Sequence, residues 1–359
     1  MPSLSICFSG MLSLSEQLLS PLKGLLCAVS DPASWPRRLQ TLAVMHFVFF
    51  WVLMLIISTW LPSYIFFFTP LWWTMPLYLV WYFYSFKDPA RGSRPWSWYK
   101  NHKVWKYFAD YFPMKLVKTA DLPPNKNYII CCHPHGIMSI GSTIHLLTNG
   151  TGFSEKFPGL TSTIMTLNGQ FYFPFRREVG MWLGGVNSSA ESLQYLLKNP
   201  GKGRAVGIVI GGATEALDAH PGNFDLNLLS RRGFCKYALK HGADLVPMYS
   251  FGENDLYDQV DNPRGSHFRN FQQTVKSLFN FCPPLLKGRS VFNWNFGLLP
   301  YRKPVNSVVG KPIHVDRVAD PSPDQIDALH SAYCEALVDL FEEHKSHYGI
   351  PPHVHLNLY

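Results

Sequence analysis

The sequence predicts an α/β fold, with a mixed and mostly parallel sheet flanked by helices and preceded by an N-terminal membrane hairpin. Continuous apolar runs at Tyr128–Cys132, Ala205–Ile210 and Leu245–Phe251 are typical of parallel strands buried on both faces. Helical patterns separate and follow these runs, as expected for an α/β sheet. Upstream, the 48 residues from Leu39 to Phe86 contain no Asp, Glu, Lys or Arg, which is far beyond any apolar element of a soluble core.

Composition limits the partners that this chain can have. Only 16% of its 359 residues are charged, against about 25% in average proteins, and the net charge is +8. A basic balance suits nucleic acid, anionic lipid or a phosphorylated substrate. The sequence has no zinc-finger spacing, no basic helix with heptads and no RNA-recognition motif, so we expect no nucleic-acid partner. Its seven cysteines form no C-x-x-C pair, which favours a reducing compartment over a disulfide framework.

The charge-free run divides into two apolar segments, Leu42–Trp60 and Ile65–Phe86, with a predicted turn at Pro62-Ser63. About 20 apolar residues span a bilayer, so residues 37–86 can form a spanning or a re-entrant hairpin. Lys and Arg flank the run on both sides. This distribution places both ends, and everything that follows, on the cytosolic side of the membrane.

Two further segments flank the hairpin. Residues 1–36 are expected to be a cytosolic or interfacial segment, in which Gln17–Val29 is a candidate interfacial helix. Residues 87–118 hold eight Lys or Arg with aromatic residues interleaved, and both kinds of residue favour the headgroup level of a membrane. We expect a membrane-surface collar there, followed by a globular cytosolic domain over residues 119–359. The aromatic residues of the collar are Trp96, Trp98, Tyr99, Trp105, Tyr107, Tyr111 and Phe112.

The run at Tyr128–Cys132 leads into His133-Pro134-His135-Gly136, and a second apolar run, Ile137–Leu147, follows. Pro134 fixes its own φ and biases His133 away from helix, whereas Gly136 permits a turn. The pattern predicts strand, tight turn and helix, with both imidazoles at the carboxyl end of the strand. Ligands of open α/β sheets bind at that edge. A lone histidine there would be an ordinary loop residue, but two around a proline favour a site.

Caps and breakers predict helices after the second apolar run. Ser188 and Glu191 have the spacing of a capping box for a helix that runs to about Lys198. Arg231–His241 has a helical pattern, and Gly242 is its expected stop.

The C-terminal part supplies two more strands and the clearest helix. Pro247 places the strand that contains it at a sheet edge or a bulge, and Val305–Val309 is a further candidate strand. Ser322, Pro323 and Gln325 have the pattern of a helix start with a capping box. An apolar stripe at helical spacing follows this start.

Polar residues follow two of the predicted strands. His133 and His135 follow the first, and Glu215 follows the second in a Gly-Gly-x-x-Glu stretch. If these strands are parallel neighbours, a base and a carboxylate that orients it share one edge. Cys131 or Cys132 could be a catalytic thiol, although both fit better as small apolar strand residues.

Three classes of site can be weighed. A serine hydrolase needs Gly-x-Ser-x-Gly, and the nearest stretch, Gly136–Gly141, is one residue too long. A metal site would have two imidazole ligands and could add His145 or Glu215, but no recognised metal spacing exists. Direct transfer needs only a base, an oxyanion stabiliser and substrate positioning. The residues fit direct transfer best.

Several motifs occur in one order along the chain. They are Tyr111-Phe-Pro113, His133-Pro-His-Gly136, Lys156-Phe-Pro-Gly159, Gly211-Gly-Ala-Thr-Glu-Ala-Leu217 with Pro221-Gly222, Arg232 to Leu239, His241 to Asn254, Gly310-Lys-Pro-Ile313 and a Leu340 to Gly349 tail. Over roughly residues 90–350 the chain thereby resembles the diacylglycerol O-acyltransferase type 2 family, and the hairpin before these motifs matches the family pattern as well.

The resemblance implies an acyl-CoA-dependent O-acyltransferase that esterifies the free hydroxyl of diacylglycerol to make triacylglycerol. Acyl-CoA would be a co-substrate, with no cofactor and no metal. Relatives acylate monoacylglycerol or long-chain (wax) alcohols instead, and the acceptor stays open. The implied location is the cytosolic face of the endoplasmic reticulum membrane or the lipid droplet surface. A non-catalytic lipid-droplet anchor and a metal-dependent lipid hydrolase are the other interpretations, and the oligomeric state, a homo-oligomer included, stays open.

The resemblance also carries residue roles. The family's His-Pro-His-Gly motif, taken as its active-site centre, corresponds to His133 to Gly136, with either His133 or His135 as the base. More distantly, the chain is similar to glycerol-phosphate acyltransferases, in which an Asp follows the His by four residues. Ile137, Met138 and Ser139 occupy that region here, so Glu215 is the candidate orienting carboxylate. The candidates for contact with the CoA phosphates are Arg176, Arg177, Arg231 and Arg232, each of which could instead be a solvated surface charge.

Overall fold

The computed structural model describes residues 35–198, 203–279, 285–291 and 297–359, so the candidate helix Gln17–Val29 lies outside the described residues. Its centre is a seven-stranded sheet in which every neighbouring pair is parallel except β10 and β7. This confirms the predicted mixed, mostly parallel sheet. In spatial order the strands are β1 (Lys115–Lys118), β10 (Asn306–Val309), β7 (Asp244–Phe251), β2 (Tyr128–His133), β5 (Arg204–Val209), β3 (Thr161–Thr166) and β4 (Gly185–Asn187).

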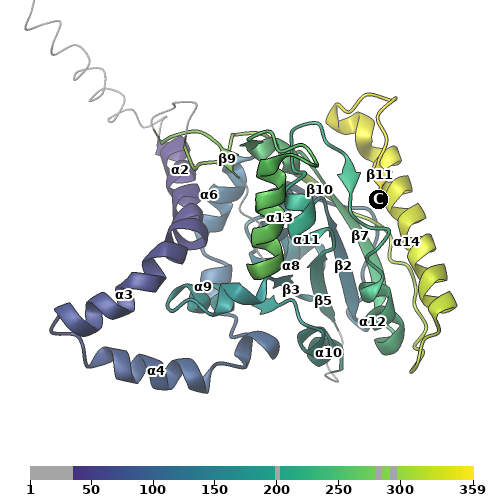
Figure 1. The fold of residues 1–359 in the computed structure, drawn as a ribbon. Coiled ribbons are helices and arrows are strands. Elements are labelled where there is room, and N and C mark those ends of the chain that lie inside the picture. Colours follow the sequence, from purple (N-terminus) through teal and green to yellow (C-terminus); the bar gives the residue numbers. More distant parts are fainter. Residues whose placement is uncertain (1–34, 199–202, 280–284, 292–296) are drawn as a thin grey trace, which may run out of the picture.

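Helices cover both faces of this sheet (Figure 1). The helices of the domain include α5 (Ser97–Lys100), α6 (Lys103–Tyr111), α7 (Ile140–Leu147), α8 (Phe153–Lys156), α9 (Arg176–Trp182), α10 (Ala190–Lys198), α11 (Gly212–Ala216), α12 (Gly233–His241), α13 (His267–Phe279) and α14 (Pro323–His344). Helices α10, α12 and α14 share one core with Ile129 and Cys131 of β2. Helices α7 and α8 share another core with Ile130 and Cys132. Because side chains alternate along a strand, β2 is buried on both faces, as its apolar run predicts.

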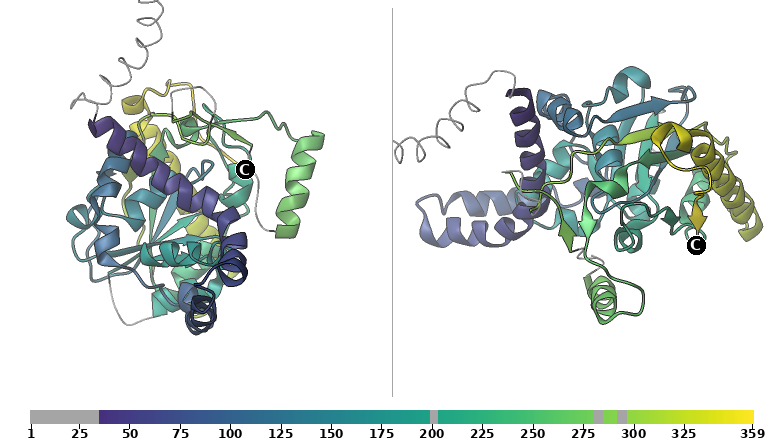
Figure 2. Two further views of the ribbon diagram at one scale, coloured as in Figure 1. Left: turned by 90° about the vertical axis from the view of Figure 1, so that its left-hand side faces the viewer. Right: turned by 90° about the horizontal axis from the view of Figure 1, so that it is seen from above.

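Short strand pairs lie outside the main sheet. β6 (Asp225–Leu226) pairs with β11 (Asn357–Leu358), and β8 (Asp258–Gln259) pairs with β9 (Leu286–Lys287). Helix α13 follows β8, and its ribbon lies at the outside of the fold in both views of Figure 2. Arg269 and Lys276 of α13 reach back to Asp218 and Thr214.

The predicted ends of three helices can be compared with the structure. α14 begins with the expected capping box, since Ser322 and Gln325 hydrogen-bond each other's backbone N–H. α12 ends at Gly242 with φ +63°, as expected for a glycine stop. The N-cap of α10 is Ser189 and not the predicted Ser188, because the hydroxyl of Ser189 accepts the Ser192 N–H at 3.1 Å.

The prediction that Pro247 marks an edge strand or a bulge is wrong for the edge and right for the bulge. β7 lies between β10 and β2 in the interior of the sheet. The last pair that β7 makes with β10 is Val309 with Met248, so Pro247 lies just beyond the end of β10. Its carbonyl accepts the Gly310 N–H at 2.8 Å, and pairing resumes beyond it between Leu245 and Ile313. Two residues of β7 therefore face three residues of the opposite strand between these pairs, which is a bulge, where a proline is tolerated.

The predicted turn at Pro62-Ser63 is also wrong. α2 (Trp35–Val48), the π-helical turn η2 (Phe49–Leu53) and α3 (Met54–Phe68) follow without a break, and Pro62 lies inside α3. Among the described residues this helix, Trp35–Phe68, is long and apolar enough to cross a membrane. The chain reverses only after it, before α4 (Thr74–Tyr84), and α3 and α4 leave the body of the fold as a pair (Figure 1).

Burial divides the apolar run at a different place from the one predicted. Ala43, Val44 and Phe47 of α2 are at most 3% exposed and belong to a core with α6 and α7. In α3, by contrast, Trp60 is 74% and Phe68 is 75% exposed. The part of the run that faces outward is therefore α3 and α4, while α2 belongs to the globular domain.

The expected membrane-surface collar is likewise partly core. Trp105, Tyr111 and Phe112 are at most 1% exposed and pack against α2 and α7. Only the first aromatics of the segment, Trp96 and Trp98, are well exposed. The spacing of α6 explains this, because its apolar positions form one helical face.

Candidate active site

The His-Pro-His-Gly loop lies at the carboxyl edge of the sheet, between two neighbours that each supply a carboxylate. β2 pairs in parallel with β5 on one side and with β7 on the other. Glu215 follows β5 within α11, and Glu253 follows β7. The sequence-based expectation that the histidines and Glu215 share one edge is therefore met.

His133 is the last residue of β2 and is 1% exposed. Alternation along the strand turns it to the same side as Ile129 and Cys131, toward α14. There its Nε2 lies 2.9 Å from the hydroxyl oxygen of Tyr333. Burial lowers the pKa of His133 to about 3, so its imidazole is neutral at neutral pH.

His135, unlike His133, is partly exposed, and it lines a cavity of about 680 Å³. Its Nδ1 lies 2.8 Å from the carbonyl oxygen of Gly136. A carbonyl oxygen only accepts, so Nδ1 carries the proton and Nε2 is left as the basic nitrogen. Burial lowers the pKa of His135, and the contact with Gly136 partly offsets that effect. The ring is a neutral base at neutral pH.

Glu215 does not contact either imidazole in the way that the sequence suggested. The side chain is 3% exposed, and its Oε2 accepts the backbone N–H of His135 at 2.6 Å. Its Oε1 accepts the backbone N–H of Asn227 at 3.0 Å. Burial raises the pKa of Glu215 to about 7, against the lowering effect of both N–H donors. Glu215 therefore holds the backbone of the loop rather than the tautomer of a ring.

Glu253 is a second buried carboxylate at the loop, which sequence reasoning missed. It is 3% exposed, and its two oxygens accept the N–H groups of Ile140 and Gly141 at 2.6 and 2.7 Å. Burial raises its pKa to about 7, against the lowering effect of these donors. The signal for it was the strand end itself, because Gly252-Glu253 follows β7 as Gly-Gly-x-x-Glu follows β5.

Arg176 and Arg177 lie at the start of α9, where Arg176 holds η2 and Arg177 holds the end of α4. Arg176 lines the cavity, donates to the carbonyls of Gln170 and Trp51 at 3.2 Å each, and lies over the Trp51 ring. Burial lowers its pKa to about 10. Arg177 is fully buried and donates to the hydroxyl and the carbonyl of Ser85 at 3.0 and 2.8 Å. Arg177 is thus committed to the end of α4 and, among the described residues, does not line the cavity.

Arg231 and Arg232 also separate in the structure. Arg231 lines the cavity, whereas Arg232 is exposed and pairs with Asp327 of α14 at 2.6 Å. Lys276 of α13 joins Arg231 and Arg176 at the cavity, and its Nζ donates to the hydroxyl of Thr214. Lys276 was missed by sequence reasoning, since a lysine on an amphipathic helix carries no signal of its own.

Apart from these cations and His135, the cavity is lined mainly by apolar residues, with a few uncharged polar ones: Ser139, Thr143, Thr166, Gln170, Ser188 and Thr214. Helix α2, η2 and α3 contribute Phe47, Trp51, Val52, Leu55 and Ile56 to one wall. Ile56 is 63% exposed, so this wall continues directly onto the apolar surface of α3. No acidic side chain stands among the described residues that line the cavity. The arrangement suits a ligand that is both apolar and anionic.

The other site classes find less support in the geometry. Cys131 and Cys132 are at most 1% exposed, and burial raises the pKa of both thiols. His145 is buried and contacts the hydroxyl of Thr151 at 2.8 Å. Within the described part of the chain, no group of three His, Cys, Asp or Glu side chains could hold a metal ion. The Ser139 hydroxyl donates to the His135 carbonyl oxygen at 2.9 Å rather than to a base.

Comparison with known proteins decides the family. Residues 64–359 match the family model described as Diacylglycerol acyltransferase. The chain belongs to the diacylglycerol acyltransferase family. It is accordingly an acyltransferase, which confirms the resemblance seen in the motifs.

Curated relatives of the family cover most of this chain. It is 45% identical over 323 residues to 2-acylglycerol O-acyltransferase 1 from Homo sapiens, which covers 88% of this chain and 94% of that protein. It is 40% identical over 352 residues to diacylglycerol O-acyltransferase 2 from Homo sapiens, at 98% and 90% coverage. Diacylglycerol O-acyltransferase 2 from Dictyostelium discoideum is 44% identical, at 86% and 92% coverage.

Among solved structures, the chain is similar to a 1-acyl-sn-glycerophosphate acyltransferase from Thermotoga maritima. The sequence identity is 13%, the TM-score is 0.36, and the match covers 82% of this chain and 96% of the other.

Proposed function

We propose that this acyltransferase uses acyl-CoA to esterify the free hydroxyl of diacylglycerol, with His135 as the general base. The observation that carries the proposal is the difference between the two imidazoles. His135 lines a cavity and keeps a basic Nε2, whereas His133 is buried against Tyr333. A general base must reach the proton that it removes, and only His135 faces space for a substrate.

The proposed reaction needs no covalent intermediate on the protein. Nε2 of His135 takes the proton of the acceptor hydroxyl while the oxygen attacks the thioester carbonyl carbon. The resulting tetrahedral oxyanion collapses, the carbon–sulfur bond breaks, and the CoA thiolate takes the proton from the imidazolium. The ester and free CoA are the products, and the atoms balance without any cofactor or metal besides the acyl-CoA co-substrate.

Cations at the cavity support an anionic co-substrate. Arg231, just before α12, and Lys276, on α13, both line the cavity. They are the candidates for contact with the CoA phosphates. Arg176 also lines it, but its guanidinium already holds Trp51 and Gln170. Arg177 and Arg232, which the sequence also suggested, are engaged elsewhere, so we leave them out of the proposed site.

The apolar hairpin supports an acceptor that arrives from the membrane. At about 1.5 Å rise per residue, the 15 residues of α3 span roughly 22 Å and the 11 residues of α4 roughly 16 Å. The continuous helix Trp35–Phe68 is long enough to cross, but α2 at its start packs in the core of the domain. The helices outside the domain core, α3 and α4, are each shorter than the bilayer's hydrocarbon thickness of about 30 Å. We therefore propose a re-entrant hairpin that enters one leaflet at the cytosolic face of the endoplasmic reticulum membrane or at a lipid droplet.

A second acceptor has equal support from the relatives. The match to a 2-acylglycerol O-acyltransferase at 45% identity favours a monoacylglycerol acceptor as much as the other relatives favour diacylglycerol. Membranes supplied with labelled acyl-CoA and equal amounts of monoacylglycerol, diacylglycerol and a long-chain alcohol would decide this. Thin-layer separation of the labelled products gives the acceptor directly, and triacylglycerol as a minor product would overturn the first choice.

The base assignment is tested by exchanging each imidazole for a neutral amide. His135→Gln removes the basic nitrogen, and we expect acyl transfer to fall by about 10²- to 10⁴-fold, the usual contribution of a general base. His133→Gln can keep a contact to the Tyr333 hydroxyl, and we expect it to retain most of its activity. Both variants should still pellet with membranes.

Two outcomes would contradict the assignment. Activity of His135→Gln within about threefold of the wild type would exclude His135 as the base. Loss of activity in His133→Gln, with unchanged thermal stability and an active His135→Gln, would transfer the role to His133.

A further inference from the structure

Glu253 is buried at the catalytic loop, and the reaction proposed above gives it no task. It is held 3% exposed at the end of β7, where Gly252 with φ +91° turns the chain. Its two oxygens accept the first two N–H groups of α7, those of Ile140 and Gly141. Among the described residues it does not line the cavity, so a direct contact with substrate is not its function.

The same side chain fixes the loop sterically. A Cβ at Gly136 would lie 2.6 Å from Cγ of Glu253, and a Cβ at Gly141 would lie 2.8 Å from its Oε2. Gly136 also has φ +59°, a conformation that favours glycine. The loop therefore passes Glu253 at two points where only glycine leaves enough room, and its path depends on where that side chain stands.

The other end of the loop is held by Glu215, which accepts the His135 N–H at 2.6 Å. The backbone between His135 and Gly141 is thus anchored at both ends by carboxylate oxygens. The direction of the His135 ring depends on this backbone, because its Nδ1 bonds to the carbonyl of Gly136. That carbonyl belongs to the residue that packs on Glu253.

We propose that Glu253 is a positioning residue for His135, which keeps Nε2 aimed into the cavity by fixing Gly136 and the start of α7. This rests on the proposed role of His135 as base. The amide groups at the start of a helix usually bind anions. In this chain the Glu253 carboxylate occupies them, so the amides of Ile140 and Gly141 do not stabilise the oxyanion of the reaction.

The test is a double-mutant cycle between Glu253 and His135. Glu253→Gln keeps the shape of the side chain but offers one acceptor to two N–H donors. We expect kcat to fall at least tenfold, with KM for acyl-CoA and for the acceptor lipid unchanged within twofold. In the His135→Gln background, where no base remains to be aimed, we expect Glu253→Gln to lower the residual rate by less than twofold.

Asp244→Asn is the matched control. Asp244 is a buried carboxylate at the opposite end of β7, and it too accepts a backbone N–H, that of Val315 at 3.1 Å. We expect it to lower thermal stability without a change in kcat per folded protein. Should Glu253→Gln not fold, Gly136→Ala displaces Glu253 from the other side and should give the same pattern in kcat and KM.

The results separate this inference from the function on which it rests. An unchanged kcat in Glu253→Gln, or an equal loss in both backgrounds, would overturn the positioning role. An active His135→Gln protein would instead overturn the base assignment, whatever Glu253→Gln does in the wild-type background.

Discussion

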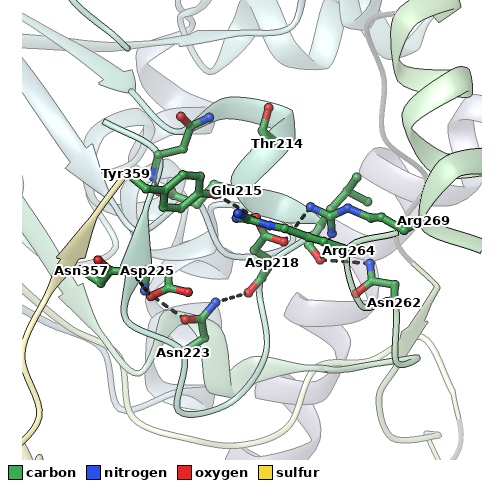
Figure 3. A network of polar contacts seen from close by, with 12 residues as sticks. Thr214, Glu215, Asp218, Asn223, Asp225, Asn262, Arg264, Arg269, Asn357 and Tyr359 are labelled. Carbon is green, nitrogen blue, oxygen red and sulfur yellow. Dashed lines mark hydrogen bonds and ion pairs between the residues drawn. The ribbon is translucent and has the colours of Figure 1, made fainter. Parts of the chain in front are cut away.

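Replacing Asp218 should destabilise the protein far more than removing its exposed partner. The carboxylate of Asp218 lies three residues after Glu215 and has three side-chain partners (Figure 3). Arg269, whose side chain is 2% exposed, donates to it at 2.6 Å. Arg264, at 61% exposure, lies 3.3 Å away, and the hydroxyl of Tyr359 donates at 2.8 Å.

The burial of these partners sets the expected magnitudes. Asp218→Ala leaves the Arg269 guanidinium buried without its carboxylate, which costs about 3–5 kcal/mol of unfolding free energy. Tyr359→Phe removes one hydrogen bond to a charged group, worth about 1.5–3 kcal/mol. Arg264→Gln removes an exposed pair, worth below about 1 kcal/mol.

Thermal unfolding of the detergent-solubilised protein, followed by tryptophan fluorescence, would measure this series. At about 2–4 °C per kcal/mol, we expect Asp218→Ala to lower Tm by about 6–20 °C and Arg264→Gln by less than about 4 °C. The variant Tyr359→Phe should fall between them. If Asp218→Ala shifted Tm no more than Arg264→Gln, the argument from burial would be refuted.

Three further predictions concern the cavity, the pH dependence and the hairpin. Lys276→Ala should raise KM for acyl-CoA about 3- to 10-fold with kcat unchanged, since it removes up to about 1.4 kcal/mol of attraction to the anionic substrate. Arg232→Ala is the control and should not change KM for acyl-CoA. Equal effects of the two substitutions on KM would refute this. Burial lowers the pKa of His145 to about 3, so below pH 6.5 the unfolded chain binds a proton that the folded protein refuses. The contribution of the neutral His145 to the free energy of unfolding is therefore fully present above pH 6.5 and is lost as the pH falls. Between pH 7.5 and 5.0, the free energy of unfolding of His145→Gln should fall by about 2 kcal/mol less than that of the wild type. Parallel plots of Tm against pH for the two proteins would contradict this. Phe67→Asp, on a side chain that is 72% exposed, should shift the protein from the membrane pellet toward the supernatant because a buried aspartate costs about 2.5–3.5 kcal/mol, whereas Tyr195→Asp on α10 should not.

Patterns that depend on neighbours in sequence predicted the fold well. The apolar runs became β2, β5 and β7, because a strand buried on both faces has no polar position to interrupt it. The capping box at Ser322 marked the start of α14, because its partners are three residues apart.

Patterns that depend on distant partners misled. Pro62 lies inside α3 and does not start a turn. Pro247 lies at a bulge in the interior of the sheet and not at an edge. The collar aromatics looked interfacial from composition, yet Trp105 and Tyr111 fill a core that forms only when α2 packs on α6. Local composition cannot say which of two apolar environments, protein or lipid, receives a side chain.

The different surroundings of the two histidines could have been predicted from the sequence. In a strand buried on both faces, Ile129, Cys131 and His133 must share one side, so His133 belongs to a core and needs a polar partner there. His135 lies past the proline and is free of that alternation.

The roles of the two glutamates could not have been predicted in the same way. Their partners are backbone N–H groups of His135, Ile140 and Gly141, and every residue except proline offers such a donor. Residue types therefore suggest that a carboxylate stands near an imidazole, as they did for Glu215. Only the path of the loop decides whether that carboxylate holds the ring or the backbone that carries it.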